Sequence, residues 1–208
     1  RPNLATRFCD RWAATWNTGD AHAIRGLHDD RHVVVHHEWD IAIDRRTEWE
    51  GEQRLIGSHV ELEALATLGE RHALHRLRIT LPHPSSGGDV LHDRFLVSRV
   101  SPGGECTVHD DTFLPEHLHR ALACLFERWA DDELDGADRR RARTIATGLR
   151  SNDVVAGRDW DAYRSTLAED VVQIDNRPAG AGELHGPDAV VAWIRELDSA
   201  AGGLTITT

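Results

Sequence analysis

The spacing of apolar residues predicts helices alternating with strands. One apolar face recurs every three or four residues near the start of the chain, as in an amphipathic helix, and consists of Leu4, Phe8, Trp12 and Trp16. Val33–Val35 is a β-branched run and predicts a strand. Runs separated by Gly, Pro and Ser predict three longer strands at about 72–81, 89–100 and 105–114. Such a meander is antiparallel, which places the chain in the α+β class.

Further helices are expected on both sides of this meander. Glu50 begins an apolar-periodic stretch that includes Leu55, Ile56 and Leu62, and it predicts the third helix. The segment 116–134 has leucines at helical spacing and predicts a connecting helix, which Asp135-Gly136 ends. Asp20 and Asp159 are expected to be N-caps of short helices.

An internal repeat is indicated by two matches in the same order. Gly-Asp-Ala-His-Ala-Ile-Arg at 19–25 corresponds to Arg-Asp-Trp-Asp-Ala-Tyr-Arg at 158–164, at an offset of 139. Glu50-Gly51-Glu52 corresponds to His185-Gly186-Pro187 at an offset of 135. The expected organisation is a complete domain at 1–115, a connecting helix and linker at 116–138, and a second copy at 139–208 that lacks its last two strands.

The order of elements, the stretch 159–164 and Val171–Pro178 resemble SnoaL-like domains of the nuclear transport factor superfamily. The resemblance covers roughly 4–115 and 143–208. It implies an α+β cone, in which a curved antiparallel sheet wraps against helices around a pocket. The link Phe113-Leu114-Pro115 into a Leu-rich helix resembles tandem copies at the carboxyl ends of large actinobacterial regulatory proteins.

Composition narrows the partners. The formal net charge is −11, so the chain lacks the basic balance of a nucleic-acid binder. There is no apolar run long enough to span a membrane, so no membrane partner is expected. The three cysteines are far apart and indicate a reducing, cytoplasmic location. Arg139–Arg143 follows the acidic Asp131–Glu133, and these runs are expected to pair with each other.

Strand alternation identifies candidate catalytic residues. On the strands near 33, 95 and 108, the mostly apolar faces are expected to point into the cone, which places Asp93, Asp110 and His37 among apolar neighbours. Carboxylates there have raised pKa values and can exchange protons with a histidine. The alternative is that Asp93 and Asp110 are solvated or paired with Arg94 and Arg78.

The expected pocket walls are apolar. Phe95 and Val108 share the faces of the two aspartates and are candidate ligand contacts. Trp39 and Trp49 bracket the loop 41–48 and either form the pocket rim or seal this loop onto the domain. The predicted ligand is a small apolar or amphipathic molecule.

Several kinds of chemistry have no motif behind them. Epoxide hydrolases of this fold have an Arg two residues before an Asp, and His92-Asp93-Arg94 does not keep this spacing. Ketosteroid isomerases of this fold use a Tyr in their oxyanion hole, but the only tyrosine here, Tyr163, is in the second copy. The pairs His36-His37, His72/His75 and His117/His119 lack metal-ligand spacing, so no metal and no cofactor are expected. No Gly-rich loop follows a strand to open a helix.

Three functions follow from this pattern. The first is a non-catalytic small-molecule-binding or regulatory and assembly domain pair of a larger protein. The second is a hydrolase, isomerase or dehydratase that acts through the pocket Asp and His residues. The third is a dimerisation module, in which homodimers form through the sheet face.

Overall fold

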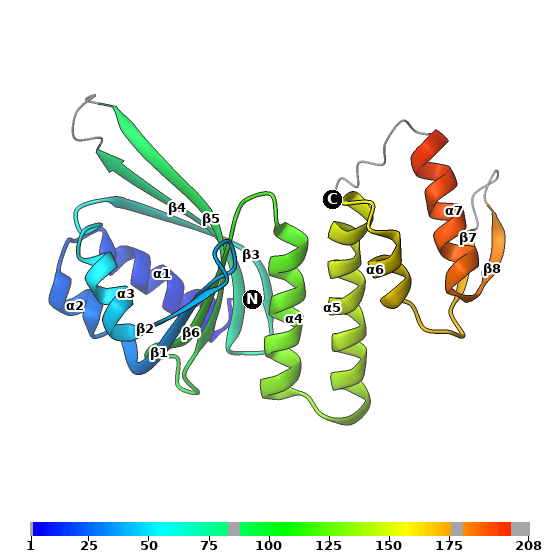
Figure 1. The fold of residues 1–208 in the computed structure, drawn as a ribbon. Helices are drawn as coiled ribbons and strands as arrows, with labels where there is room; N and C mark the ends of the chain where they lie inside the picture. The colour runs from blue at the N-terminus through cyan, green and yellow to red at the C-terminus, as the bar shows by residue number, and fades with distance from the viewer. Residues whose placement is uncertain (1, 83–87, 176–180, 201–208) are drawn as a thin grey trace. The chain divides into compact units, whose positions relative to one another are not determined.

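The computed structural model describes residues 2–82, 88–175 and 181–200, and its contacts divide the chain into two compact units, Arg1–Ala146 and Thr147–Thr208 (Figure 1). The first unit contains α1 (Leu4–Trp16), α2 (Ala21–Arg25), β1 (His28–His36), β2 (Ile41–Asp44), α3 (Arg45–Glu52), β3 (His59–Leu68), β4 (His72–Pro82), β5 (Asp89–Val100), β6 (Thr107–Phe113) and α4 (Leu118–Glu133). None of the described helices combines the length and the apolar character that crossing a bilayer requires.

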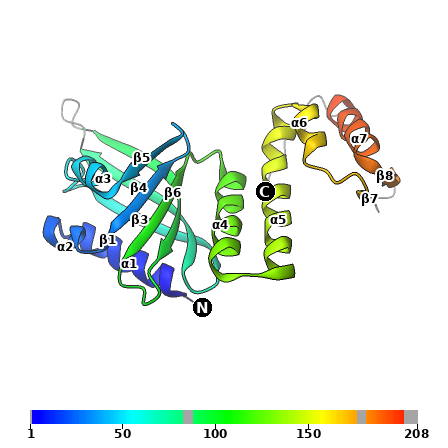
Figure 2. The same cartoon turned by 60° about the horizontal axis from the view of Figure 1, so that its bottom comes forward.

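The first unit is α+β, built on one curved six-stranded sheet in the order β2-β1-β6-β5-β4-β3 (Figure 2). The strands predicted at 72–81, 89–100 and 105–114 are confirmed as β4, β5 and β6. The sheet is mixed and not wholly antiparallel as predicted, because β1 pairs with β6 in parallel, with Val34 opposite Asp110. Such a pairing joins segments distant in the sequence, so local turn signals do not reveal it.

Helices cover both faces of this sheet. The helices α1, α2 and α3 lie on one side and α4 lies on the other (Figures 1 and 2). Under α4 the core consists of Leu74, Phe95, Val97, Phe113, Ala121, Cys124 and Leu125. The expected domain end at residue 115 leaves out this helix, whereas its apolar face packs directly on β4, β5 and β6.

Short polar side chains start the helices on the cavity side. Asp20 accepts hydrogen bonds from the amides of His22 and Ala23, which confirms the predicted N-cap. Asn3 and Asp44 cap α1 and α3 in the same way. Because these caps fix where each helix begins, they also fix which side chains face the sheet.

The third helix is shorter than the apolar spacing predicts. It begins at Arg45 and ends at Glu52, and Gly57, with a φ of 97°, leads the chain into β3. Leu62, expected on that helix, pairs with Leu77 of β4. The loop expected at 41–48 instead holds β2 and the start of α3. Pairing along the whole length of β4 outweighs the helix propensity of the Glu, Leu and Ala residues in β3.

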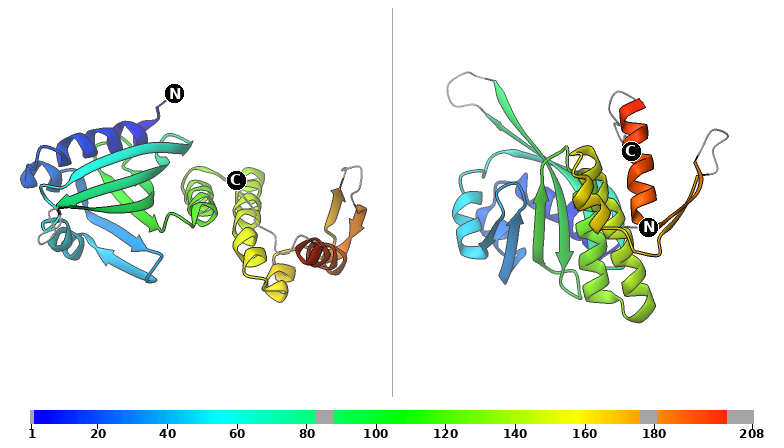
Figure 3. Two further views of the ribbon diagram at one scale, coloured as in Figure 1. Left: turned by 90° about the horizontal axis from the view of Figure 1, so that it is seen from above. Right: turned by 45° about the vertical axis from the view of Figure 1, so that its right-hand side comes forward.

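The second unit contains α6 (Trp160–Ser165), β7 (Val172–Asp175), β8 (Gly182–His185) and α7 (Gly186–Ala200), and α5 (Gly136–Ala156) leads into it. Its strands form a two-stranded antiparallel hairpin beside α7 (Figure 3). Asp159 caps α6 as predicted, by accepting a hydrogen bond from the amide of Ala162. The order helix, helix, strand, strand, helix from α5 to α7 is the same as the order from α1 to α3.

Candidate ligand-binding site

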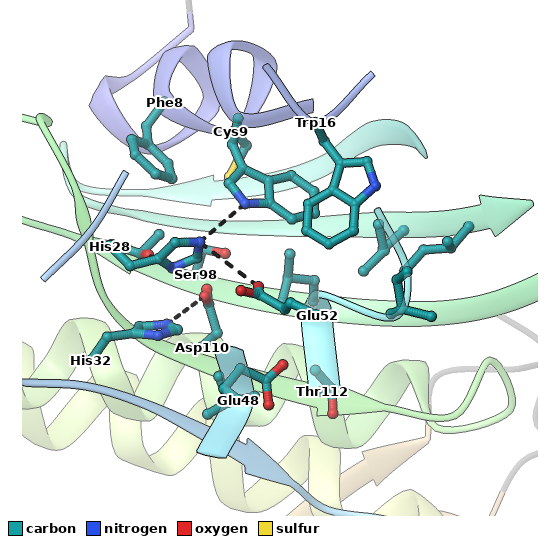
Figure 4. Close-up of a pocket in the computed structure, with 17 residues that line it drawn as sticks. Phe8, Cys9, Trp16, His28, His32, Glu48, Glu52, Ser98, Asp110 and Thr112 are labelled. Atoms are coloured by element: carbon teal, nitrogen blue, oxygen red, sulfur yellow. Dashed lines mark hydrogen bonds and ion pairs between the residues drawn. The ribbon is translucent and has the colours of Figure 1, made fainter. Parts of the chain in front are cut away.

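A cavity of about 90 Å³ lies between α1, α3 and the sheet of the first unit (Figure 4). Its walls are mostly apolar or aromatic, from Phe8, Trp12, Trp16, Val34, Leu55, Leu77, Ile79 and Leu96. Its polar side chains include His28, His32, Ser98 and Asp110 of the sheet, with Glu48 and Glu52 of α3. A liquid water occupies about 30 Å³, so the space admits a few waters, a small molecule or one end of a larger one.

His32 and Asp110 form a buried pair in the wall of this cavity. His32 Nε2 lies 2.8 Å from Asp110 Oδ2, and the two side chains are 1% and 10% exposed. Because an ionised carboxylate only accepts hydrogen bonds, Nε2 carries the proton that is donated. Burial by itself would raise the pKa of Asp110, but the hydrogen bond from His32 opposes it and helps to hold that pKa below its usual value.

His28 lies next to this pair, with its ring centroid 4.7 Å from that of His32. Trp12 Nε1 donates to His28 Nε2 over 3.3 Å. Nδ1 therefore carries the proton and donates it to Thr107 Oγ1 at 3.0 Å. Burial, reinforced by the charge of Arg45, lowers the pKa of His28 from 6.5 to about 3, so the ring is neutral.

Glu52 brings a second carboxylate to the cavity. Arg45 Nη1 donates to Glu52 Oε2 at 2.7 Å, and both side chains are about nine-tenths buried. Glu52 Oε1 lies 3.8 Å from His28 Nε2. Burial raises the pKa of Glu52, and the neighbouring Arg45 only partly opposes this. The carboxyl groups of Asp110 and Glu52 thus have opposite pKa shifts, which is the arrangement that separates a proton acceptor from a proton donor.

The buried pair of His32 and Asp110 has two polar atoms without a hydrogen-bond partner among the described residues, namely His32 Nδ1 and Asp110 Oδ1. A buried polar atom in this state costs about 1–3 kcal/mol. Both atoms are hydrogen-bond acceptors when Asp110 is ionised and His32 carries its proton on Nε2. Both residues line the cavity, and their two unpartnered atoms are ones that a hydrogen-bond donor would satisfy.

The structure does not bring Asp93 and Asp110 together. Asp110 lies opposite Ser98 on the cavity face, whereas Asp93 shares the alternate face of β5 with Phe95 and Val97. Arg76 binds Asp93 in a bidentate manner, with Nε and Nη2 at 3.0 and 2.6 Å. The hydrogen bond from Arg76 lowers the pKa of Asp93. The predicted placement inside the cone is wrong for Asp93, because the more apolar face of β5 is covered by α4 and does not line the cavity.

His37 also belongs to the α4 side. Its Nε2 lies 2.9 Å from Asp111 Oδ1, and its ring stacks on Phe113 with centroids 4.2 Å apart. Of the three predicted catalytic residues, only Asp110 lines the cavity.

The four predicted ligand contacts lie outside the cavity wall. Phe95 is in the core under α4, and Val108 lines a separate surface hollow with Asp29 and Arg31. Trp39 is 60% exposed. Trp49 packs beside the core that contains Trp16, and the Arg45 guanidinium lies 5.1 Å from the centre of its ring. Trp49 thus contributes indirectly, since it positions the arginine that holds Glu52.

Sequence reasoning missed His28, His32 and Glu52. The signal for the two histidines was their even spacing, because residues four apart on a strand share a face. The predicted strand started at Val33, whereas β1 starts at His28 and contains a register shift before Val33. Glu52 offered no comparable signal, since its position follows from where α3 ends.

No protein-family model matches the sequence, and a comparison with curated proteins finds no significant match. Solved structures are similar in fold. An epoxide hydrolase/cyclase-like enzyme described in pyran ring formation in polyether salinomycin is 14% identical over 52% of this chain and 88% of its own, with a TM-score of 0.46. A Mycobacterium tuberculosis protein in complex with estradiol-17beta-hemisuccinate is 12% identical over 54% and 94%, with a TM-score of 0.47. A pinacolase from Penicillium brevicompactum is 14% identical over 54% and 83%, with a TM-score of 0.46.

Proposed function

We propose that the first unit binds a small, mostly apolar molecule that donates hydrogen bonds to Asp110 and His32. The observation that carries this proposal is that two buried atoms, Asp110 Oδ1 and His32 Nδ1, have no hydrogen-bond partner within the described part of the chain, beside a largely apolar cavity. An apolar body gains free energy by leaving water, and its donor group satisfies the two acceptors. Primary amides and amines, whose nitrogen carries at least two N–H donors, are the classes that fit.

The second unit is proposed to be a partial copy of the first, in a chain that acts as a binding and regulatory domain pair. The shared order of elements from α1 to α3 and from α5 to α7 supports this, together with the corresponding caps Asp20 and Asp159. Nothing in this role requires the second unit to bind a ligand of its own.

A matched pair of probes tests the binding proposal. Isobutyramide and isobutyronitrile share a carbon skeleton, but only the amide donates hydrogen bonds. The measurement is ligand-observed NMR on the full chain, with a chelator present to remove metal ions. We expect the amide to bind at least about tenfold more tightly than the nitrile, in line with one good hydrogen bond to a charged group. Equal affinity of the two probes would contradict the proposal.

Variants locate the bound probe. Asp110→Leu removes the charged acceptor and is expected to abolish the preference for the amide, whereas Asp93→Leu on the other face leaves it unchanged. Circular dichroism checks that both variants are folded. A ligand found in this way that is chemically converted by the wild-type chain, and not by Asp110→Leu, would favour the enzymatic alternative.

A further inference from the structure

We propose that His28, His32 and Asp110 form a binding site for a divalent transition-metal ion. One ligand atom from each side chain lies within 4.8 Å of those of the other two. Two imidazoles and one carboxylate are a ligand set that binds Zn²⁺ and neighbouring first-row metals with positions left open. Ligand atoms around tetrahedral Zn²⁺ lie about 3.4 Å apart, so the side chains need to move by only about 1 Å.

The surroundings orient His28 as a ligand. The ring N–H at Nδ1 donates to Thr107 Oγ1, which leaves the lone pair of Nε2 on the side of Trp12 and Glu52. Ligating histidines commonly donate their second nitrogen to a protein acceptor in this manner. The ion would replace the long hydrogen bond from Trp12, which is among the weaker ones of the cavity at 3.3 Å.

His32 and Asp110 are already drawn together by their 2.8 Å contact, and each keeps one buried atom without a partner among the described residues. An ion bound at Nε2 takes the place of the proton that His32 donates to Asp110, and that proton moves to Nδ1, so the imidazole stays neutral. The Asp110 carboxylate then binds the ion in place of the N–H.

The cavity can complete the coordination. Glu52 Oε1 is 3.8 Å from His28 Nε2 and can supply a fourth ligand, and about 90 Å³ of space admits one or more coordinating waters. Asp110 balances one of the two charges of the ion, whereas Glu52 shares its charge with Arg45, which holds it in place.

A second group of metal-ligand residue types, His37, Asp111 and Cys124, serves as a contrast. Arg128 already donates to both carboxylate oxygens of Asp111 at 2.9 Å. A cation at this place would meet the guanidinium, so this group holds α4 on the sheet and does not compete for the ion.

Titration of the full chain with Co²⁺ tests the proposal, because its visible absorption depends on the ligands. We expect one ion per chain, with bands that His28→Gln, His32→Gln or Asp110→Asn each abolishes. Thr107→Val is expected to weaken binding about 10-fold or more, since it removes the group that orients His28. His59→Gln, at an exposed histidine of β3, is the matched control and is expected to leave the spectrum unchanged.

Thermal unfolding keeps the result interpretable if a substitution disturbs the fold. Co²⁺ and Zn²⁺ should raise the unfolding temperature of the wild type and of His59→Gln, but not that of a folded His32→Gln variant. The metal site would be overturned if the wild type bound Co²⁺ no more tightly than His28→Gln, His32→Gln and Asp110→Asn do, or if the Co²⁺ absorption bands survived in these variants. The probe experiment with isobutyramide is done with a chelator present, so its outcome is independent of this one.

Discussion

Asp110 and Asp111 are adjacent in β6, yet their carboxylates lie on opposite faces of the sheet. Asp110 pairs with His32 beside the cavity, whereas Asp111 pairs with Arg128 of α4. The first residue is free to serve a ligand because the second carries the structural contact. A substitution of Asp110 should therefore affect the cavity, whereas a substitution of Asp111 should affect the packing of α4.

Asp111→Asn is expected to destabilise the fold without affecting the cavity. The carboxylate is completely buried, and its pKa lies far below the usual range because hydrogen bonds from His109, His37 and Arg128 outweigh burial. Breaking a buried ion pair costs about 3–5 kcal/mol, and we expect about 2–4 kcal/mol because the Arg128 side chain is 37% exposed. Urea unfolding measures this, with Asp131→Asn, in an exposed pair with Arg143, as a control that changes little.

The same carboxylate makes stability depend on acid. Its folded pKa lies below its unfolded value, so its contribution is present above about pH 4 and is lost as the pH falls through that value towards the folded pKa. Asp111→Asn should therefore be less sensitive to acid than the wild type between about pH 4 and pH 2. Parallel curves for the two proteins would count against a charged Asp111 in the fold.

His75 predicts a second pH dependence, nearer to neutrality. It is buried, both ring nitrogens are without partners among the described residues, and burial lowers its pKa from 6.5 to about 4. The unfolded chain thus takes up a proton first, so stability is full above about pH 6.5 and falls as the pH drops towards 4. The loss is about 3 kcal/mol.

His75→Leu is expected to reduce this loss in urea unfolding measured from pH 7.5 to 4.5. It does not remove the loss entirely, because His28 has a pKa lowered in the same direction. His59→Gln, at an exposed position, is the control. An unchanged pH profile in His75→Leu would show that His75 is charged or hydrated in the folded chain.

Gly69 joins β3 to β4 with a φ of 57°, in the left-handed region. A Cβ there would also collide with the carboxylate of Glu133, which bonds to His72. Gly69→Ala is expected to cost about 1–2 kcal/mol for the backbone alone and more for the displaced carboxylate. Gly19→Ala is the matched control, since its φ is 73° but no atom lies within 4 Å of its Cβ. Equal losses in urea unfolding would exclude a role for Glu133.

The two ends of the chain should differ as isolated fragments. Residues 143–208 contain only a two-stranded sheet in their described part, on which Val172 and Ile174 are 47% and 62% exposed. A lone hairpin packed on one helix is marginal, and its edges can pair with other chains. We expect 1–134 to unfold cooperatively at any concentration and 143–208 to self-associate or to lack a cooperative transition. A concentration-independent transition for 143–208 would show that it has a sufficient core of its own.

The local features of the fold were predictable from sequence, and the features set by tertiary contacts were not. Turn residues mark β4, β5 and β6, and aspartates mark α2 and α6, because both signals act within a few residues. β3 was mistaken for a helix, since its identity depends on pairing with β4. The cavity face of β5 was assigned to Phe95 in place of Leu96, because alternation defines two faces but does not say which helix covers each one.

The candidate site was found only in part for the same reason. Asp110 was identified from its parity with apolar neighbours, but its partner His32 comes from a strand that is distant in the sequence and parallel to β6. Only the pairing of the two strands places them together.

That pairing gives the cavity an unusual position in the folding of the first unit. His32 and Asp110 are 78 residues apart, on the strands that come first and last in the chain and lie next to each other in the sheet. Contacts of such long range form late, because their loop must close before they are made. A chain emerging from the ribosome therefore has no such pair until β6 has been synthesised. Anything that binds there ties the beginning of the unit to its end, so its occupancy would resist the separation of these strands and the opening of the whole sheet.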